Sequence, residues 1–262
     1  MSVARDRFAQ VVRAPEVDLG QACLLLAAEE DPGLEVDDWL GALDELAGYL
    51  PVEGHPPDRL RHLLSGFVGS PEDYADLRSS LLPHVLRRHR GLPILLSVVW
   101  LEVARRAGIP AYGVGLPGHF VVGVGHPDGW HELVDPWRGG RRLRTGQAAE
   151  LAEAAGVPFH SGLLRPWEPV EILQRVLANI RAWAGDTLER RHTRLWAVEL
   201  GLLLPRHPAA LRRERGELLV RGGDFVRGAA ALEEYADAVQ PADPAAAEVT
   251  RRTARAARAR LN

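Results

Sequence analysis

The segment 91–136 most constrains the fold, because the period of its apolar residues changes within it. It begins with a nearly continuous apolar run that reads ILLSVVWLEVARRAG. Such a run predicts a helix that other structure surrounds on most sides. Gly108 is typical of the residue after a helix C-terminus, and Pro110 prevents continuation. Three short β-rich runs follow, which read AYGVGL, HFVVGV and WHELVD. The segment therefore predicts a buried helix packed on a small antiparallel sheet.

Two polar side chains occupy defined places in these strands. His119 opens the second run, and Asp135 closes the third. If Gly125–Gly129 forms a five-residue hairpin loop, Val124 pairs with Trp130, and His119 lies directly opposite Asp135 on one face. Directly opposed residues have Cβ atoms about 4.5–5.5 Å apart, within reach of an imidazole–carboxylate hydrogen bond. A carboxylate in this place fixes the histidine tautomer and supports the imidazolium, as in a catalytic triad. The spacing predicts His119 and Asp135 as a candidate catalytic pair.

Other interpretations of these residues remain open. A histidine in a strand next to Gly118 also fits a structural role, and an aspartate before a proline often caps a turn. A metal site formed by His119, His131 and Asp135 is chemically possible, since imidazole and carboxylate suit zinc. No histidine pair at helical metal-ligand spacing supports that site. The sequence therefore implies no metal and no other cofactor.

The segments on both sides of this core are predicted to be helical. Three parts are expected: an N-terminal helical lobe at 1–86, the core at 87–148 and a helical C-terminal region at 149–262. Ser70 is expected to cap a short turn in the first part. A hairpin at about 206–241 has residues at tetratricopeptide-like positions, with Gly228 in place of the usual alanine; the matching residues are Gly216, Gly223, Phe225, Leu232 and Pro241. One such unit cannot bury its apolar face alone, so we expect it to stack on the preceding helices.

Four motifs carry a resemblance to a known family. They read, in order, YADLRSSLL, RRHRGLPILLSVVWLEVARR, GIPAYGVGLPGHF and DPWRGG. Together they resemble the transglutaminase-like, or papain-like, core, and more narrowly its SirB-type branch, named for an invasion-gene regulator. The resemblance implies an α+β fold, with a helical N-terminal lobe and a tetratricopeptide-like C-terminal region. It also implies a triad of cysteine, histidine and aspartate, of which His119 and Asp135 would be two members.

The sequence departs from this family at two positions. Counting back from Gly108, the family's nucleophilic cysteine falls at Pro93. A proline side chain has no nucleophile, although its ring suits the first turn of a helix. The SirB-type branch commonly has proline here, so the resemblance implies that this proline is inherited. Ser79 stands where the family often has asparagine, which makes the role of its loop less certain.

Other residues are weak candidates for the missing nucleophile or for a binding site. Cys23, the single cysteine, lies in an apolar helix and is expected to be buried and inert. Ser97 follows Pro93 by one helical turn, but a serine in a buried helix usually donates to the carbonyl four residues back. Arg138 and Arg141 follow the DPW motif and could bind an anionic ligand or an acidic peptide, although exposed loop arginines are the simpler interpretation. Pro93, Ser97, Arg138 and Arg141 are thus the candidate binding residues.

Composition narrows the possible partners and the location. A formal net charge of −3 gives no reason to expect nucleic acid as a specific partner. The sequence shows no secretory signal and no apolar run long enough to cross a bilayer, so we expect a cytoplasmic protein without membrane contact. It does not determine the oligomeric state.

Two functions follow from these observations. The first is a non-catalytic or cryptic scaffold that binds a protein or peptide partner. The second is a hydrolase or acyl-transfer enzyme, with His119 as general base, Asp135 as its orienting residue, and Ser97 or water as nucleophile. The absence of the cysteine favours the first.

Overall fold

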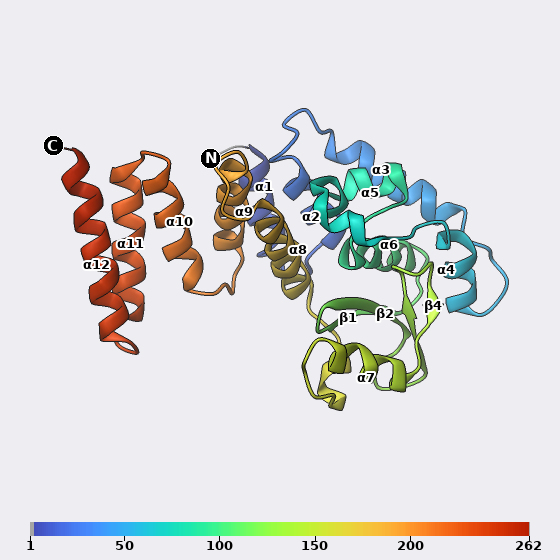
Figure 1. Cartoon of the computed structure of the whole chain (residues 1–262). Coiled ribbons are helices and arrows are strands. Elements are labelled where there is room, and N and C mark those ends of the chain that lie inside the picture. Colours follow the sequence, from blue (N-terminus) through green and yellow to red (C-terminus); the bar gives the residue numbers. More distant parts are fainter. Residues whose placement is uncertain (1–2, 262) are drawn as a thin grey trace. The chain divides into compact units, whose positions relative to one another are not determined.

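The sheet and its covering helices lie in the first of two units, Met1–Val176, and the second unit, Leu177–Asn262, is helical. The computed structural model describes residues 3–261 (Figure 1). The boundary between the units falls within one helix. The three-part division at 86 and 148 stays a prediction. No helix among residues 3–261 combines the length and apolar character needed to span a membrane.

Helices and short 3₁₀ turns form the chain before the sheet. Asp18 caps the second helix by accepting a hydrogen bond from the Gln21 N–H at 2.8 Å, and this helix is almost wholly buried. Ser70 is the N-cap of the first 3₁₀ turn, as its position predicts. The elements are α1 (Val3–Val11), α2 (Leu19–Ala27), α3 (Val36–Gly48), α4 (Pro56–Leu64), η1 (Pro71–Ala75), η2 (Leu77–Ser80) and α5 (Leu82–Arg88).

The predicted buried helix is α6 (Pro93–Arg106), which packs on the first two strands. Pro93 occupies the first turn of this helix. After the helix ends, Gly108 has a φ of +65°, a left-handed conformation that suits glycine. The sheet is antiparallel in the order β1-β2-β3-β4; its strands are β1 (Ala111–Leu116), β2 (His119–Gly125), β3 (His131–Asp135) and β4 (Arg141–Arg142). The fold is therefore α+β, with a buried helix packed on a small antiparallel sheet and helical flanks.

The β2–β3 register differs from the predicted one. Val124 pairs with Glu132 and not with Trp130, so the predicted register was wrong by two residues. An even shift keeps every side chain on its expected face of the sheet. His119 and Asp135 therefore still share a face, but as diagonal neighbours and not as directly opposed residues.

The cause of this difference is the position of the hairpin loop. Gly125 remains in β2, where its N–H donates to the Pro110 carbonyl at 2.8 Å. Its φ of +120° suits glycine, and a Cβ would lie 2.3 Å from the Trp130 carbonyl oxygen. The loop is thus 126–130, closed by a hydrogen bond from the His126 N–H to the Trp130 carbonyl at 3.0 Å. A glycine that looks like a turn residue in the sequence therefore continues the strand.

One face of the sheet is covered after β4. There, α7 (Thr145–Ala154) contributes Ala148 to an apolar cluster with Val114, Leu116, Val121 and Leu133. In Figure 1, α6 and α7 lie on opposite sides of β1 and β2. The chain then forms η3 (Ser161–Leu164) and enters α8 (Pro169–Ala184), which contains the boundary between the units.

The second unit continues with a helical hairpin and two flanking helices. At Gly228, a Cβ would lie 3.0 Å from the Gly216 carbonyl oxygen and 2.9 Å from the Val220 nitrogen. The helices of the hairpin thus approach so closely that alanine at position 228 would require a backbone shift. The elements are α9 (Arg191–Leu203), α10 (Ala210–Arg221), α11 (Phe225–Val239), α12 (Pro244–Arg258) and η4 (Ala259–Leu261).

Candidate functional site

The His119 and Asp135 side chains form a buried pair between β2 and β3. His119 Nε2 lies 2.9 Å from Asp135 Oδ1, and the two side chains are 9% and 2% exposed. A carboxylate can only accept, so Nε2 is the donor of this hydrogen bond, and in a neutral imidazole Nδ1 is then the acceptor nitrogen. No described residue forms a hydrogen bond with Nδ1. The predicted contact is present, while its catalytic role stays a prediction.

The turn after β3 holds the same carboxylate. The Trp137 backbone N–H donates to Asp135 Oδ1 at 3.1 Å, and Arg138 Nε lies 3.7 Å from Oδ2. The Trp137 ring meets the His119 ring edge to face, with centroids 5.8 Å apart. Asp135 therefore links the start of β2 to the DPW turn. This is a structural role, and it does not require that Asp135 take part in catalysis.

The Trp137 indole also connects this pair to the loop before α6. A Cβ at Gly69 would lie 1.8 Å from the indole and 2.7 Å from the Gly91 carbonyl oxygen. The Gly69 N–H donates to the Trp137 carbonyl at 3.1 Å. Only glycine at position 69 allows the loop to pass this close to the ring.

The start of α6 lacks an available nucleophile. Pro93 and Ser97 are both buried. The Ser97 hydroxyl donates to the Pro93 carbonyl at 2.8 Å, the bond expected of a serine in a buried helix. No hydrogen bond or ring contact among residues 3–261 joins either residue to His119. The assignments of Ser97 to catalysis and of both residues to binding stay untested predictions.

The two candidate arginines lie on the surface. Arg138 is 52% exposed and forms the long ion pair with Asp135. Arg141 is exposed at the start of β4, which is a short edge strand. Their guanidinium groups are therefore placed where an anionic partner can reach them.

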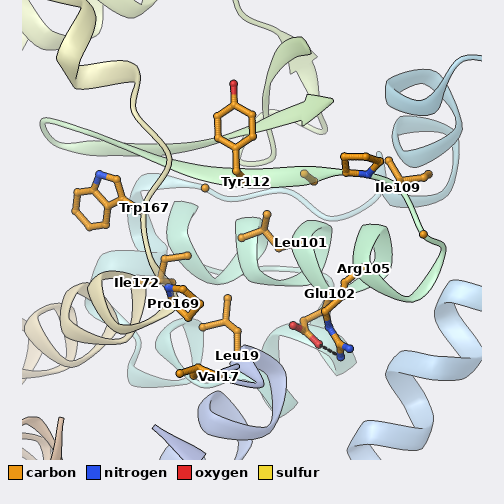
Figure 2. Close-up of a pocket in the computed structure, with 14 residues that line it drawn as sticks. Val17, Leu19, Leu101, Glu102, Arg105, Ile109, Tyr112, Trp167, Pro169 and Ile172 are labelled. Carbon is orange, nitrogen blue, oxygen red and sulfur yellow. Dashed lines mark hydrogen bonds and ion pairs between the residues drawn. The ribbon is translucent and has the colours of Figure 1, made fainter. Parts of the chain in front are cut away.

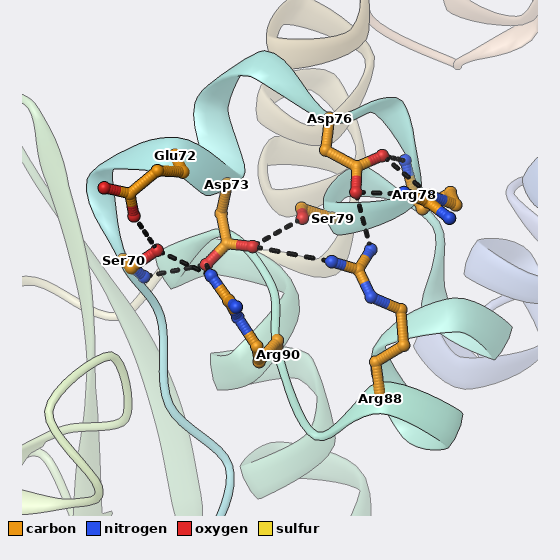
Figure 3. A network of polar contacts seen from close by, with 8 residues as sticks. All are labelled: Ser70, Glu72, Asp73, Asp76, Arg78, Ser79, Arg88 and Arg90. Carbon is orange, nitrogen blue, oxygen red and sulfur yellow. Dashed lines mark hydrogen bonds and ion pairs between the residues drawn. The ribbon is translucent and has the colours of Figure 1, made fainter.

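A buried carboxylate that the sequence analysis did not single out organises the loop before α6 (Figure 3). Asp73 has a side chain that is 1% exposed, and its two oxygens have different partners. Oδ2 accepts from the Ser70 N–H at 2.7 Å, and Oδ1 accepts from the Ser79 hydroxyl at 2.9 Å. Arg90 and Arg88 approach the carboxylate at 3.5 and 3.8 Å. Asp73 is thus the central acceptor of this loop.

This network fixes the residue that precedes α6. The Ser79 carbonyl accepts a hydrogen bond from the Leu92 N–H at 2.9 Å, and Leu92 is the N-cap of α6. Ser79 thereby couples Asp73 to the helix start, which gives its loop a structural role. A signal was present in the sequence: an acid three residues after a capping serine forms a capping box.

A second carboxylate extends the network toward solvent. Asp76 lies 2.9 Å from Arg88 Nη1 and accepts from Arg78. Burial favours its neutral form, but the Arg78 hydrogen bonds and the positive charges of Arg88 and Arg78 outweigh this, so the pKa of Asp76 is lowered. Its negative charge is therefore maintained in the folded chain.

Cys23 lies in α2 and is fully buried. Burial, with smaller contributions from the negative charges of Glu102 and Asp18, raises the pKa of its thiol above the ordinary value. A thiol held neutral is a poor nucleophile. No group of three or more histidine, cysteine or acidic residues within 3–261 is arranged to hold a metal ion.

Comparison with known proteins places this chain in a family. A family model described as the transglutaminase-like superfamily matches residues 42–178. A UPF0162 protein of Xylella fastidiosa is 32% identical over 214 residues, which cover 76% of this chain and 75% of that protein. A UPF0162 protein of Pseudomonas aeruginosa is 35% identical over 198 residues, or 70% and 72% of the two chains. Mouse F-box only protein 21 is 38% identical over 56 residues, 21% of this chain and 9% of that protein. The chain therefore belongs to the transglutaminase-like superfamily.

Proposed function

We propose that this chain is a non-catalytic, SirB-type member of the superfamily that binds a protein or peptide partner in the cytoplasm. The observation that carries the proposal is the start of α6. The position that resemblance assigns to a cysteine is Pro93, which is buried, and the hydroxyl of Ser97 donates to its carbonyl. A helix start without a thiol or a free hydroxyl offers no group for covalent catalysis.

The His119–Asp135 pair has a sufficient structural role in this proposal. The Asp135 side chain is 2% exposed. Its carboxylate accepts hydrogen bonds from the His119 imidazole and the Trp137 N–H, and it forms an ion pair with Arg138. A buried carboxylate with several partners holds its neighbours in one geometry. The pair thereby keeps the DPW turn in place, and the turn presents Arg138 and Arg141 on the surface. The partner that this surface suits is an acidic segment of a protein or peptide, and a partner with such a segment would give the chain a regulatory role.

We expect the double substitution Arg138→Glu/Arg141→Glu to abolish partner binding, because it reverses two charges on this surface. The test is affinity capture from the native cell, followed by measurement of binding between the purified partner and each variant. The matched control is Arg13→Glu/Arg252→Glu, which makes the same charge change at two other exposed positions. Equal loss of binding in both double variants, or no loss in either, contradicts the proposed surface.

A second candidate function rests on one observation. His119 Nδ1 has no hydrogen-bond partner among the described residues, so it is free to act as a general base toward water. We expect a panel of amide, ester and thioester substrates to show no turnover above that of Asp135→Asn, because the start of α6 supplies no covalent nucleophile and water activated by a general base alone is a weak one. Turnover that requires both His119 and Asp135, in variants that remain folded by circular dichroism, would establish the hydrolase function instead.

A further inference from the structure

A groove opens beside the outer edge of β1, at the C-terminal half of α6 (Figure 2). Its volume is about 510 Å³, within the range typical of ligand sites, about 300–1,000 Å³. Its lining contains none of the residues of the His119–Asp135 region or the Arg138–Arg141 surface. The apolar side chains in its wall come from three parts of the first unit and include Val17, Leu19, Leu101, Ile109, Trp167 and Ile172.

The wall on the β1 side consists largely of backbone. The Tyr112 ring points away from Leu101 and Ile172, to the other side of the strand (Figure 2). Its neighbours Ala111 and Gly113 have small side chains or none and also line the groove. A ligand in the groove can therefore approach the main chain of β1 at Ala111, whereas the Phe120 and Ile172 side chains fill the space over Gly113.

The hydrogen-bonding pattern shows which backbone groups face this groove. The Gly125 N–H donates to the Pro110 carbonyl, so positions 110 and 125 form a hydrogen-bonded pair of the β1–β2 ladder. Such pairs alternate with pairs whose N–H and C=O groups point away from each other. Ala111 pairs with Val124 in the ladder, so its N–H and C=O point outward, toward the free edge. Gly113 follows the same rule two residues later.

The segment before α8 pairs with one residue of this edge and then turns away from it. Trp167 forms an antiparallel bridge with Gly113, and its N–H donates to the Gly113 carbonyl at 2.9 Å. In that register, Pro169 would come opposite Ala111, but Pro169 has no N–H and begins α8. No backbone hydrogen bond from residues 3–261 to the outward groups of Ala111 is present. The edge is thus occupied at Gly113 and open at Ala111, directly on the groove.

The groove is electrically neutral. Its two charged lining residues, Glu102 and Arg105, pair with each other at 3.0 Å, and Glu102 is 2% exposed and also pairs with Arg106. A neutral apolar wall beside an open strand edge matches an uncharged segment in extended conformation. Extended peptides bind in this way, with main-chain hydrogen bonds to the edge and alternate side chains in apolar pockets.

We propose that this groove binds an extended, predominantly apolar peptide segment, which pairs with Ala111 and extends the pairing that Trp167 makes with the β1 edge at Gly113. The peptide residue opposite Ala111 donates its N–H to the Ala111 carbonyl and accepts from the Ala111 N–H. Apolar side chains at alternate positions contact Leu19, Leu101 and Ile172. This site is independent of the proposed Arg138–Arg141 surface, so each can fail without the other.

The test uses the full chain and end-capped, fluorescein-labelled hexapeptides with valine, leucine or isoleucine alternating with threonine. We expect saturable binding by fluorescence anisotropy and protection of the Ala111 amide from hydrogen exchange. N-methylation of the peptide residue that pairs with Ala111 removes one hydrogen bond and weakens binding by about tenfold. N-methylation of the next residue, whose N–H points away from β1, is the matched control and has a smaller effect.

Two protein variants complete the test. Ala111→Pro removes the outward N–H, a change that an edge strand tolerates, and should weaken binding about tenfold. Leu101→Glu places a charge on the apolar wall and should weaken it further, which keeps the proposal testable if Ala111→Pro does not fold. Absence of saturable binding overturns the proposal. Binding that neither pairing-site N-methylation nor Leu101→Glu weakens also overturns it.

Discussion

Replacement of Asp73 by alanine is expected to lower the free energy of unfolding by about 2–4 kcal/mol. The carboxylate is 1% exposed, and its removal leaves the buried Ser79 hydroxyl and the Ser70 N–H without their acceptor. Arg90 and Arg88 also lose a countercharge. Urea unfolding followed by tryptophan fluorescence measures the change. Because the Ser79 carbonyl holds Leu92, we also expect faster hydrogen exchange at the first turn of α6.

The control for this prediction is Asp76→Ala. Asp76 pairs with two arginines, but its side chain is 23% exposed, so solvent replaces much of what is lost and the expected cost is about 1 kcal/mol. Its lowered pKa means that this contribution is present above the ordinary carboxyl pKa and disappears as the pH falls through the folded value. Equal costs for Asp73→Ala and Asp76→Ala at neutral pH would show that the buried carboxylate does not organise the loop.

Replacement of Gly140 by alanine is expected to lower the free energy of unfolding by about 2–5 kcal/mol, since two costs add. Gly140 has a φ of +77°, which costs an L-residue about 1–2 kcal/mol. Its Cβ would also lie 2.3 Å from the Trp100 ring, which is fully buried in α6. The Gly140 N–H donates to the Asp135 carbonyl at 2.8 Å, so displacement of this turn should also disturb the His119–Asp135 pair. Urea unfolding and the His119 imidazole NMR signals report the two effects.

Gly156 provides a matched control for the backbone cost alone. Its φ is +76°, and a Cβ there would meet nothing within 4 Å. Gly156→Ala should therefore cost only about 1–2 kcal/mol. If the two alanine variants are equally stable, the turn after Asp135 moves easily away from Trp100, and the rigid support that we assign to the pair is absent.

The sequence predicted the core well because its signals there are local. The apolar run before Gly108 predicted α6, and three short β-rich runs predicted β1, β2 and β3. The predicted face of each side chain was also correct, because an error of two residues in the β2–β3 register leaves His119 and Asp135 on the same face of the sheet. The exact register failed because Gly125 has the character of a turn residue, whereas its hydrogen-bond partner Pro110, which holds it in β2, lies just before β1 and is distant in the chain.

The supporting residues of the site were harder to predict, because their partners are distant in the chain. Asp73 belongs to a local capping pattern with Ser70, but its burial depends on Ser79, Arg88 and Arg90 arriving from later segments. Gly69 gives no sequence signal of its need to pass close to Trp137. Such glycines can be identified only once the contacting ring is placed.

By itself, the sequence determined the buried core helix, the three strands that follow it and the absence of a cysteine at position 93, because helix and strand periods and residue identity are properties of the chain alone. The fourth strand, β4, was not predicted. Only the tertiary structure decided that Asp73 is buried among Ser79, Arg88 and Arg90 and that the open part of the β1 edge lies at Ala111. Both depend on which backbone and side-chain groups meet after folding. Hydrogen bonds are short-ranged and directional, so no pattern of residue types fixes them before the segments pack together.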